Sequence, residues 1–159
     1  MTELRTPNQQ MLPQDRLSAR AKPIPWSDAF EMGDPELDAE HRAFFDIINA
    51  LSEAVSARTD AARLAALCDV LVEHSAAHFL HEEEVMARHG FGGLAAHRRE
   101  HGRLLAYIRE RAALLRSPAA TAEERAEAAL DVKDALLGHM LRVDVHYKSH
   151  LLERRRRTG

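Results

Sequence analysis

The sequence predicts an all-α protein, an antiparallel up-down-up-down four-helix bundle preceded by an N-terminal arm. The chain of 159 residues is 45% hydrophobic and 30% charged, with seven glycines and six prolines, and it is rich in alanine, leucine, glutamate and arginine. These residues favour helix, and no alternating run of β-branched residues competes with it. Four stretches carry apolar residues at spacings of three and four, and short connections join them. Amphipathic helices with short joins pack as an antiparallel bundle, and this length suits one domain.

Capping residues and helix breakers set the expected limits of the four helices. The expected starts are Asp34–Pro35, Thr59, Leu94 and Thr121. Glu124 lies three residues after Thr121, which is the spacing of a capping box. The expected ends are near Ala57, at Gly90, at Ser117–Pro118 and beyond Tyr147.

We expect three segments along the chain. Residues 1–25 carry four of the six prolines and predict an extended arm. Residues 26–150 form the bundle, and Trp26 at its start is expected to pack the arm onto it. Residues 151–159 form a basic tail in which four consecutive arginines, Arg154 to Arg157, complement a helix C-terminus.

Composition excludes several classes of protein. The formal net charge of −3, with basic residues mixed among acidic ones, argues against a nucleic-acid partner. No stretch of about 18 apolar residues predicts a membrane span, and no targeting segment is recognisable. The single cysteine, Cys68, cannot form an internal disulfide and is expected to be a buried small hydrophobe. We therefore expect a cytoplasmic protein.

Side chains of the kinds that bind metals recur on the inner faces of all four predicted helices. They are His41 early in the first helix, His78 and Glu82 late in the second, His97 and His101 early in the third, and His139 and Asp144 late in the fourth. In an antiparallel bundle, early positions on one helix lie beside late positions on the next. All seven therefore fall at one end, which predicts a shared metal site rather than unrelated core and surface histidines.

The ligand types narrow the choice of metal. Imidazole and carboxylate without thiolate suit iron, manganese or zinc. Seven ligands are too many for one ion, so two ions are expected. If Glu82 and Asp144 bridge them along with a solvent-derived oxygen, each ion gains three ligands from the bridges. Five histidines then divide three and two, which leaves one ion with an open position. His139 and Asp144 are five residues apart, about 140° from a common face, so the helix must distort there or Asp144 must reach in from the side.

These motifs resemble the hemerythrin family. The pattern comprises DxxH ending at His41, HFxxEE from His78 with Met86 following, HxxxH from His97, and HxxxxD from His139 with Tyr147 three residues on. The WSDAF lead-in followed by MG resembles the bacterial branch, and the likeness covers Trp26 to His150. It implies a non-haem di-iron centre with His97, His101 and His139 on one iron, His41 and His78 on the other, and Glu82 and Asp144 bridging both.

The resemblance also implies a function. Members of the family bind dioxygen reversibly at the iron with the open position, so we expect an oxygen carrier, store or local supply rather than an enzyme. Two alternatives stay open. One is a di-iron enzyme, such as a peroxidase, an oxidase or a nitric-oxide scavenger, and the other is a sensor of oxygen or iron that acts through the N-terminal arm.

The expected ligand pocket departs from the family pattern at two positions. Ala135 stands where related chains usually carry tryptophan, and Met140 replaces the isoleucine that usually follows the histidine of HxxxxD. We expect the small alanine to ease ligand access and to shorten the life of the oxygenated state. The remaining expected lining residues are Phe45, Phe79, Leu136, Leu141 and Tyr147. Tyr147 is expected either to hydrogen-bond near a bridging carboxylate or to pack.

The other polar residues near the motifs have simpler interpretations. His74 is expected to be a satisfied core histidine or a support for His78. The residues expected to be solvated or to support the ligands are His81, Glu83, Glu84, His89 and His146, with His150 in a surface role.

Overall fold

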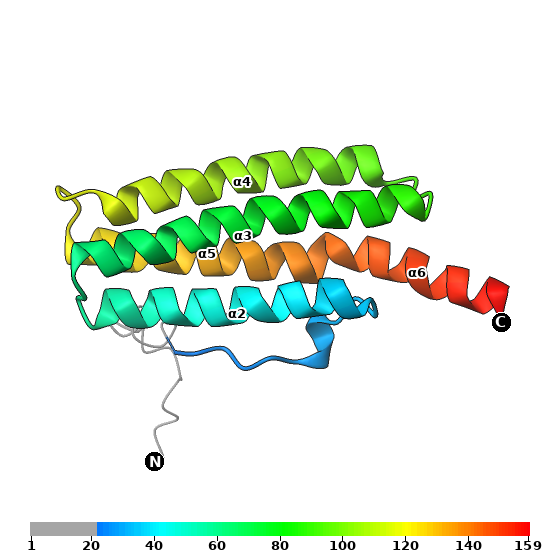
Figure 1. The fold of residues 1–159 in the computed structure, drawn as a ribbon, viewed down its shortest axis with the longest axis horizontal. Coiled ribbons are helices and arrows are strands. Elements are labelled where there is room, and N and C mark those ends of the chain that lie inside the picture. The colour runs from blue at the N-terminus through cyan, green and yellow to red at the C-terminus, as the bar shows by residue number, and fades with distance from the viewer. Residues whose placement is uncertain (1–21) are drawn as a thin grey trace, which may run out of the picture.

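The described part of the computed structural model, residues 22–159, contains no strand and is an antiparallel four-helix bundle (Figure 1). Its elements are the short 3-10 helix η1 (Asp28–Phe30), α2 (Pro35–Ser56), α3 (Ala61–Arg88), α4 (Leu94–Arg116), α5 (Ala122–Arg142) and α6 (Asp144–Thr158). The predicted fold class is confirmed. The predicted arm lies outside the described residues except for its last four.

The four long helices alternate in direction and form a ring. Each packs against its neighbours in sequence, and α2 packs against α5 to close the ring. The α2–α3 and α4–α5 connections lie at one end of the bundle, and the α3–α4 connection lies at the other (Figure 1). Helix α6 continues from α5 and projects beyond that second end. None of the helices in residues 22–159 is long and apolar enough to cross a membrane.

Side-chain caps begin the helices close to the predicted positions. Asp34 caps α2 by accepting hydrogen bonds from the Glu36 and Leu37 amides, and the capping box of Thr121 and Glu124 is formed. The prediction of Thr59 as the cap of α3 is wrong by one residue. Asp60 accepts the hydrogen bond from the Arg63 amide at 2.8 Å. The Thr59 amide instead donates to the Ala54 carbonyl and belongs to the turn that ends α2.

The fourth helix is broken at Val143, which is one of the two outcomes that the spacing of its two metal-type residues allowed. Helix α5 ends at Arg142, and Val143 has φ −105° and ψ −53° before α6 begins at Asp144. The break changes the rotation of the chain about the helix axis. Both His139 and Asp144 are consequently buried within the bundle.

Two apolar clusters flank this buried polar region. The larger fills the bundle between α2, α3, α4 and α5 and includes Cys68, which is fully buried as predicted. The smaller surrounds Tyr147 and extends to Leu151. Helix α6 runs uninterrupted across the predicted boundary between bundle and tail at residue 150. The division into arm, bundle and tail stays a prediction.

Trp26 joins the segment before α2 to the bundle, as predicted. Its ring contacts Phe45 edge-on with 5.2 Å between centroids, and the Arg42 guanidinium lies 4.7 Å from the ring centroid. Nearby, Ile24 and the Asn49 side chain exchange two hydrogen bonds. These contacts hold the lead-in segment along α2.

Gly90, which ends α3 with φ +64°, generates a test of the fold. A Cβ at this position would meet no atom within 4 Å, so Gly90→Ala perturbs only the backbone. We expect it to lower the free energy of unfolding by about 1–2 kcal/mol, because the left-handed conformation disfavours L-residues. Urea denaturation measures the change.

Gly102 provides the matched control, since it lies inside α4 and a Cβ there also meets no atom within 4 Å. Gly102→Ala is expected to raise the free energy of unfolding by about 0.5–1 kcal/mol. Equal changes in the free energy of unfolding of the two variants would contradict the left-handed conformation of Gly90.

Candidate metal centre

All seven predicted ligands converge at the end of the bundle where α3 meets α4. They are His41 from α2, His78 and Glu82 from α3, His97 and His101 from α4, His139 from α5, and Asp144 from α6, and each is buried. The alternation of early and late positions therefore brings the side chains together as the sequence predicted.

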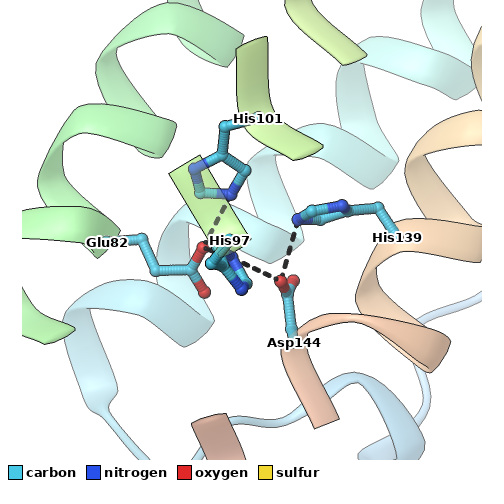
Figure 2. Close-up of side chains that lie close together, drawn as sticks. All are labelled: Glu82, His97, His101, His139 and Asp144. Carbon is cyan, nitrogen blue, oxygen red and sulfur yellow. Dashed lines mark hydrogen bonds and ion pairs between the residues drawn. The ribbon is translucent and has the colours of Figure 1, made fainter. Parts of the chain in front are cut away.

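Five of these residues form one group. The candidate ligand atoms of Glu82, His97, His101, His139 and Asp144 all lie within 4.8 Å of one another. Figure 2 shows the side chains pointing at a common point, and they come from α3, α4, α5 and α6. The Nε2 atoms of His97 and His101 each lie 3.1 Å from Glu82 Oε2, and His139 Nε2 lies 2.9 Å from Asp144 Oδ1.

A second group consists of His41, His78 and Glu82, whose candidate ligand atoms also lie within 4.8 Å of one another. Glu82 belongs to both groups. The Nε2 atom of His41 lies 3.5 Å from Asp144 Oδ2, so the other carboxylate also reaches both groups. The geometry is that of two adjacent positions with three histidines at one, two at the other, and two carboxylates between them.

The unsatisfied polar atoms fit bound cations. Six buried atoms of this cluster make no hydrogen bond within the described structure: both Asp144 oxygens, Glu82 Oε1, and Nε2 of His41, His101 and His139. Buried polar atoms are almost always paired, because an unpaired one loses its hydration without replacement. Carboxylate oxygens and imidazole nitrogens facing one another are donors to metal, so this cluster suits metal ions.

Hydrogen bonds on the outer side of the rings orient three of the histidines. His41 Nδ1 donates to the Phe30 carbonyl at 3.1 Å, His78 Nδ1 to Glu40 Oε2 at 2.7 Å, and His101 Nδ1 to Glu83 Oε1 at 2.8 Å. Because each acceptor is an oxygen without a hydrogen, the proton sits on Nδ1. The Nε2 lone pair then faces the interior of the cluster, as metal coordination requires.

Sequence reasoning missed two of these acceptors. Glu40 directly precedes a predicted ligand, but a helix turns about 100° per residue, so nothing in the sequence indicated that it reaches α3. Its carboxylate accepts from His78 and also from His81 Nδ1 at 2.6 Å. The Phe30 carbonyl is a backbone group and leaves no sequence signal. His74 is satisfied through Nε2, which lies 2.9 Å from the Glu40 carbonyl oxygen.

Electrostatics keep both carboxylates ionised. Burial alone would raise their pKa values, but interactions with the histidine nitrogens that face them outweigh it. The pKa of Glu82 falls to about 2, and that of Asp144 falls well below its usual range. Burial also opposes the charged form of His97, yet Asp144 and Glu82 raise its pKa to about 9. Two buried negative charges thus attract positive charge to the cluster.

The predicted pocket residues lie in different places. Phe79 stacks on His101 with 4.2 Å between ring centroids, and Phe45, Leu136 and Met140 are buried in the same core cluster. The prediction for Leu141 is wrong, because this side chain is 46% exposed. Leu141 follows Met140 directly, and the rotation of the helix turns it outward.

Ala135 lines a groove between α4 and α5 that reaches His139 from outside. The groove has a volume of about 410 Å³, and its lining includes Tyr107, Gly138 and Arg142. The Arg142 guanidinium lies over Gly138, where a Cβ would approach Nη2 to 2.3 Å. The small residue at 135 therefore leaves space beside a predicted metal ligand.

The Tyr147 hydroxyl is hydrogen-bonded to His89 rather than to a bridging carboxylate. Its oxygen lies 2.6 Å from His89 Nδ1, and its ring packs edge-on against Phe91. Burial raises the pKa of Tyr147 to about 12, so the phenol stays protonated. Its visible role is to join α6 to the end of α3.

Comparison with known proteins agrees with this site. The family model "Hemerythrin HHE cation binding domain" matches residues 32–151. Myohemerythrin of Riftia pachyptila is 35% identical over 129 residues, which cover 81% of this chain and 94% of that protein. Bacteriohemerythrin of Ralstonia nicotianae is 38% identical over 87 residues, 55% of this chain and 60% of that protein. Bacteriohemerythrin of Methylococcus capsulatus is 28% identical over 110 residues, 69% and 82% respectively.

The matched region contains every residue of the cluster, from His41 to Asp144. The resemblance inferred from the motifs, including the likeness to bacterial members, is confirmed. The chain belongs to the hemerythrin family.

Proposed function

We propose that this protein holds two iron ions and binds dioxygen reversibly, as a carrier, a store or a local supply of oxygen. The observation that carries the proposal is the pair of ligand groups sharing Glu82. In this proposal His97, His101 and His139 hold one iron, and His41 and His78 hold the other. Glu82, Asp144 and a solvent-derived oxygen bridge them, which leaves one iron with the open position.

The chain's own residues shield part of the cluster from water. The iron pair would supply the coordination position and the electrons for oxygen binding. Phe79, 4% exposed, stacks on His101 and keeps water from that side of the cluster.

The buried thiol of Cys68 accords with a reducing compartment, and we place the protein in the cytoplasm.

The groove at Ala135 supports a second candidate function. It brings solvent-accessible space to His139, so small reductants or peroxides can approach the centre from that side. A di-iron peroxidase, oxidase or nitric-oxide scavenger would use such access. Turnover of peroxide or nitric oxide with a reductant would favour this candidate over the carrier.

An absorption spectrum tests the proposed function directly. Iron-loaded protein is reduced without oxygen, exposed to air and then returned to an oxygen-free atmosphere. Bands that appear in air and vanish when oxygen is withdrawn, with two irons per chain by metal analysis, are the expected result. Irreversible conversion to an oxidised spectrum would contradict reversible binding, and a chain that retains no iron would contradict the di-iron centre.

Ala135→Trp is expected to slow autoxidation several-fold, because a large ring would fill the groove that reaches His139. The decay of the oxygenated spectrum in air measures the rate. Ala113→Trp places the same ring at an exposed position on α4 outside that groove, and its rate should match the wild type. An unchanged rate in Ala135→Trp would refute the role of Ala135 in ligand access.

Glu40→Gln is expected to weaken metal binding by about 10–100-fold, because it removes the charged acceptor that orients His78. Competition with a chelator measures metal affinity independently of oxygen binding. Glu84→Gln makes the same change at an exposed position of α3 and should leave the metal affinity unaltered. Equal affinities in the two variants would show that Glu40 does not position His78.

A further inference from the structure

A second cavity lies at the opposite end of the bundle from the candidate metal centre. It sits where the α2–α3 and α4–α5 connections lie together (Figure 1) and has a volume of about 430 Å³. Small-molecule sites commonly range from about 300 to 1,000 Å³. Its apolar lining combines the buried side chains of Ala54, Leu64 and Leu115 with more exposed ones, which are Val55, Ala61, Pro118 and Ala122.

The rim of this cavity is positively charged. Arg58, Arg116 and Arg125 belong to the lining, and no carboxylate does. Arg116 forms an ion pair with Asp69, which lies outside the lining. Arg125 donates to the carbonyls of Leu115 and Ser117 at 3.2 and 2.6 Å. An apolar floor beneath excess positive charge complements an amphiphile with an anionic head.

Arg58 occupies a backbone position that favours glycine. It follows the Ala57 cap of α2 with φ +50°, and it is the one residue other than glycine with positive φ in the described chain. Helices commonly end with glycine in this conformation, because a Cβ is disfavoured there. Placing a long cationic side chain at the rim despite this strain motivates a functional interpretation.

The Thr59 hydroxyl gives an independent indication of a ligand. It belongs to the cavity lining, its oxygen is buried, and it has no hydrogen-bond partner among the described residues. A rotation of the Thr59 side chain would let this hydroxyl donate to a carboxylate placed beside Arg58. The residue pair thus offers one charged donor and one neutral donor at the same side of the cavity.

We propose that this cavity binds a single-chain fatty carboxylate. The alkyl chain lies along the more exposed apolar lining residues Val55, Ala61, Pro118 and Ala122, and the carboxylate accepts hydrogen bonds from Arg58. A guanidinium and a carboxylate form the strong charge-assisted pair that such a site needs. The site requires no metal, so it stands apart from the proposed oxygen chemistry.

Calorimetric titration of the full-length protein with decanoate and with decanol tests the proposal. Decanoate is expected to bind with one molecule per chain and more tightly than decanol. Arg58→Gln should weaken decanoate binding about tenfold, as expected for one charge-assisted contact, and leave decanol binding unchanged. Arg109→Gln, the same charge change at an exposed position of α4 outside the lining, should bind decanoate like the wild type.

A variant that fills the cavity distinguishes binding inside the cavity from binding to surface charge. Ala61 is exposed and belongs to the lining, so Ala61→Leu should fold normally, which circular dichroism verifies. The larger side chain should weaken the binding of both decanoate and decanol. Absence of decanoate binding, equal affinity for decanol, an unaffected Arg58→Gln variant or an equal loss in Arg109→Gln would each overturn the proposal.

Discussion

The structure depends on burying five histidines and two carboxylates inside a helical bundle. Such a cluster destabilises a fold unless its members are paired or bind cations, because each loses its hydration. Here the carboxylates lie between the histidines, and Glu82 and Asp144 remain ionised with strongly lowered pKa values. Several buried nitrogen and oxygen atoms nevertheless lack hydrogen-bond partners within residues 22–159. The arrangement is therefore complete only with positive charge at its centre.

The requirement to orient the histidines explains the architecture around them. Glu40 and Glu83 extend the cluster to the outer faces of α2 and α3, and the Phe30 carbonyl extends it to the lead-in segment. Asp38 holds that segment by accepting hydrogen bonds from the Met32 and Gly33 amides at 2.5 and 3.2 Å. The lead-in is thus part of the support for the site and not merely a connection.

The two ends of the bundle have different chemistry. The end that holds the cluster is closed by Tyr147, by contacts of α6 with the end of α3, and by hydrogen bonds from His150 and Arg154 to the His89 carbonyl. The other end has an apolar cavity with arginines at its rim. Core packing between the ends, centred on side chains such as Phe44 and Leu71, separates the polar cluster from that cavity. One fold thereby accommodates two unrelated environments.

The sequence by itself determined the helices, the all-α class and the convergence of the ligands. These features follow from helix periodicity and local caps, such as Asp34 and the Thr121 capping box, which involve residues close together in the chain. The spacing of His139 and Asp144 left open a helix distortion or a sideways reach of Asp144, and the structure has the break at Val143. Tertiary structure alone decided contacts between helices, including Glu40 with His78 and Tyr147 with His89. Such contacts depend on how each helix is rotated and seated against its neighbours, which spacing within one helix does not specify.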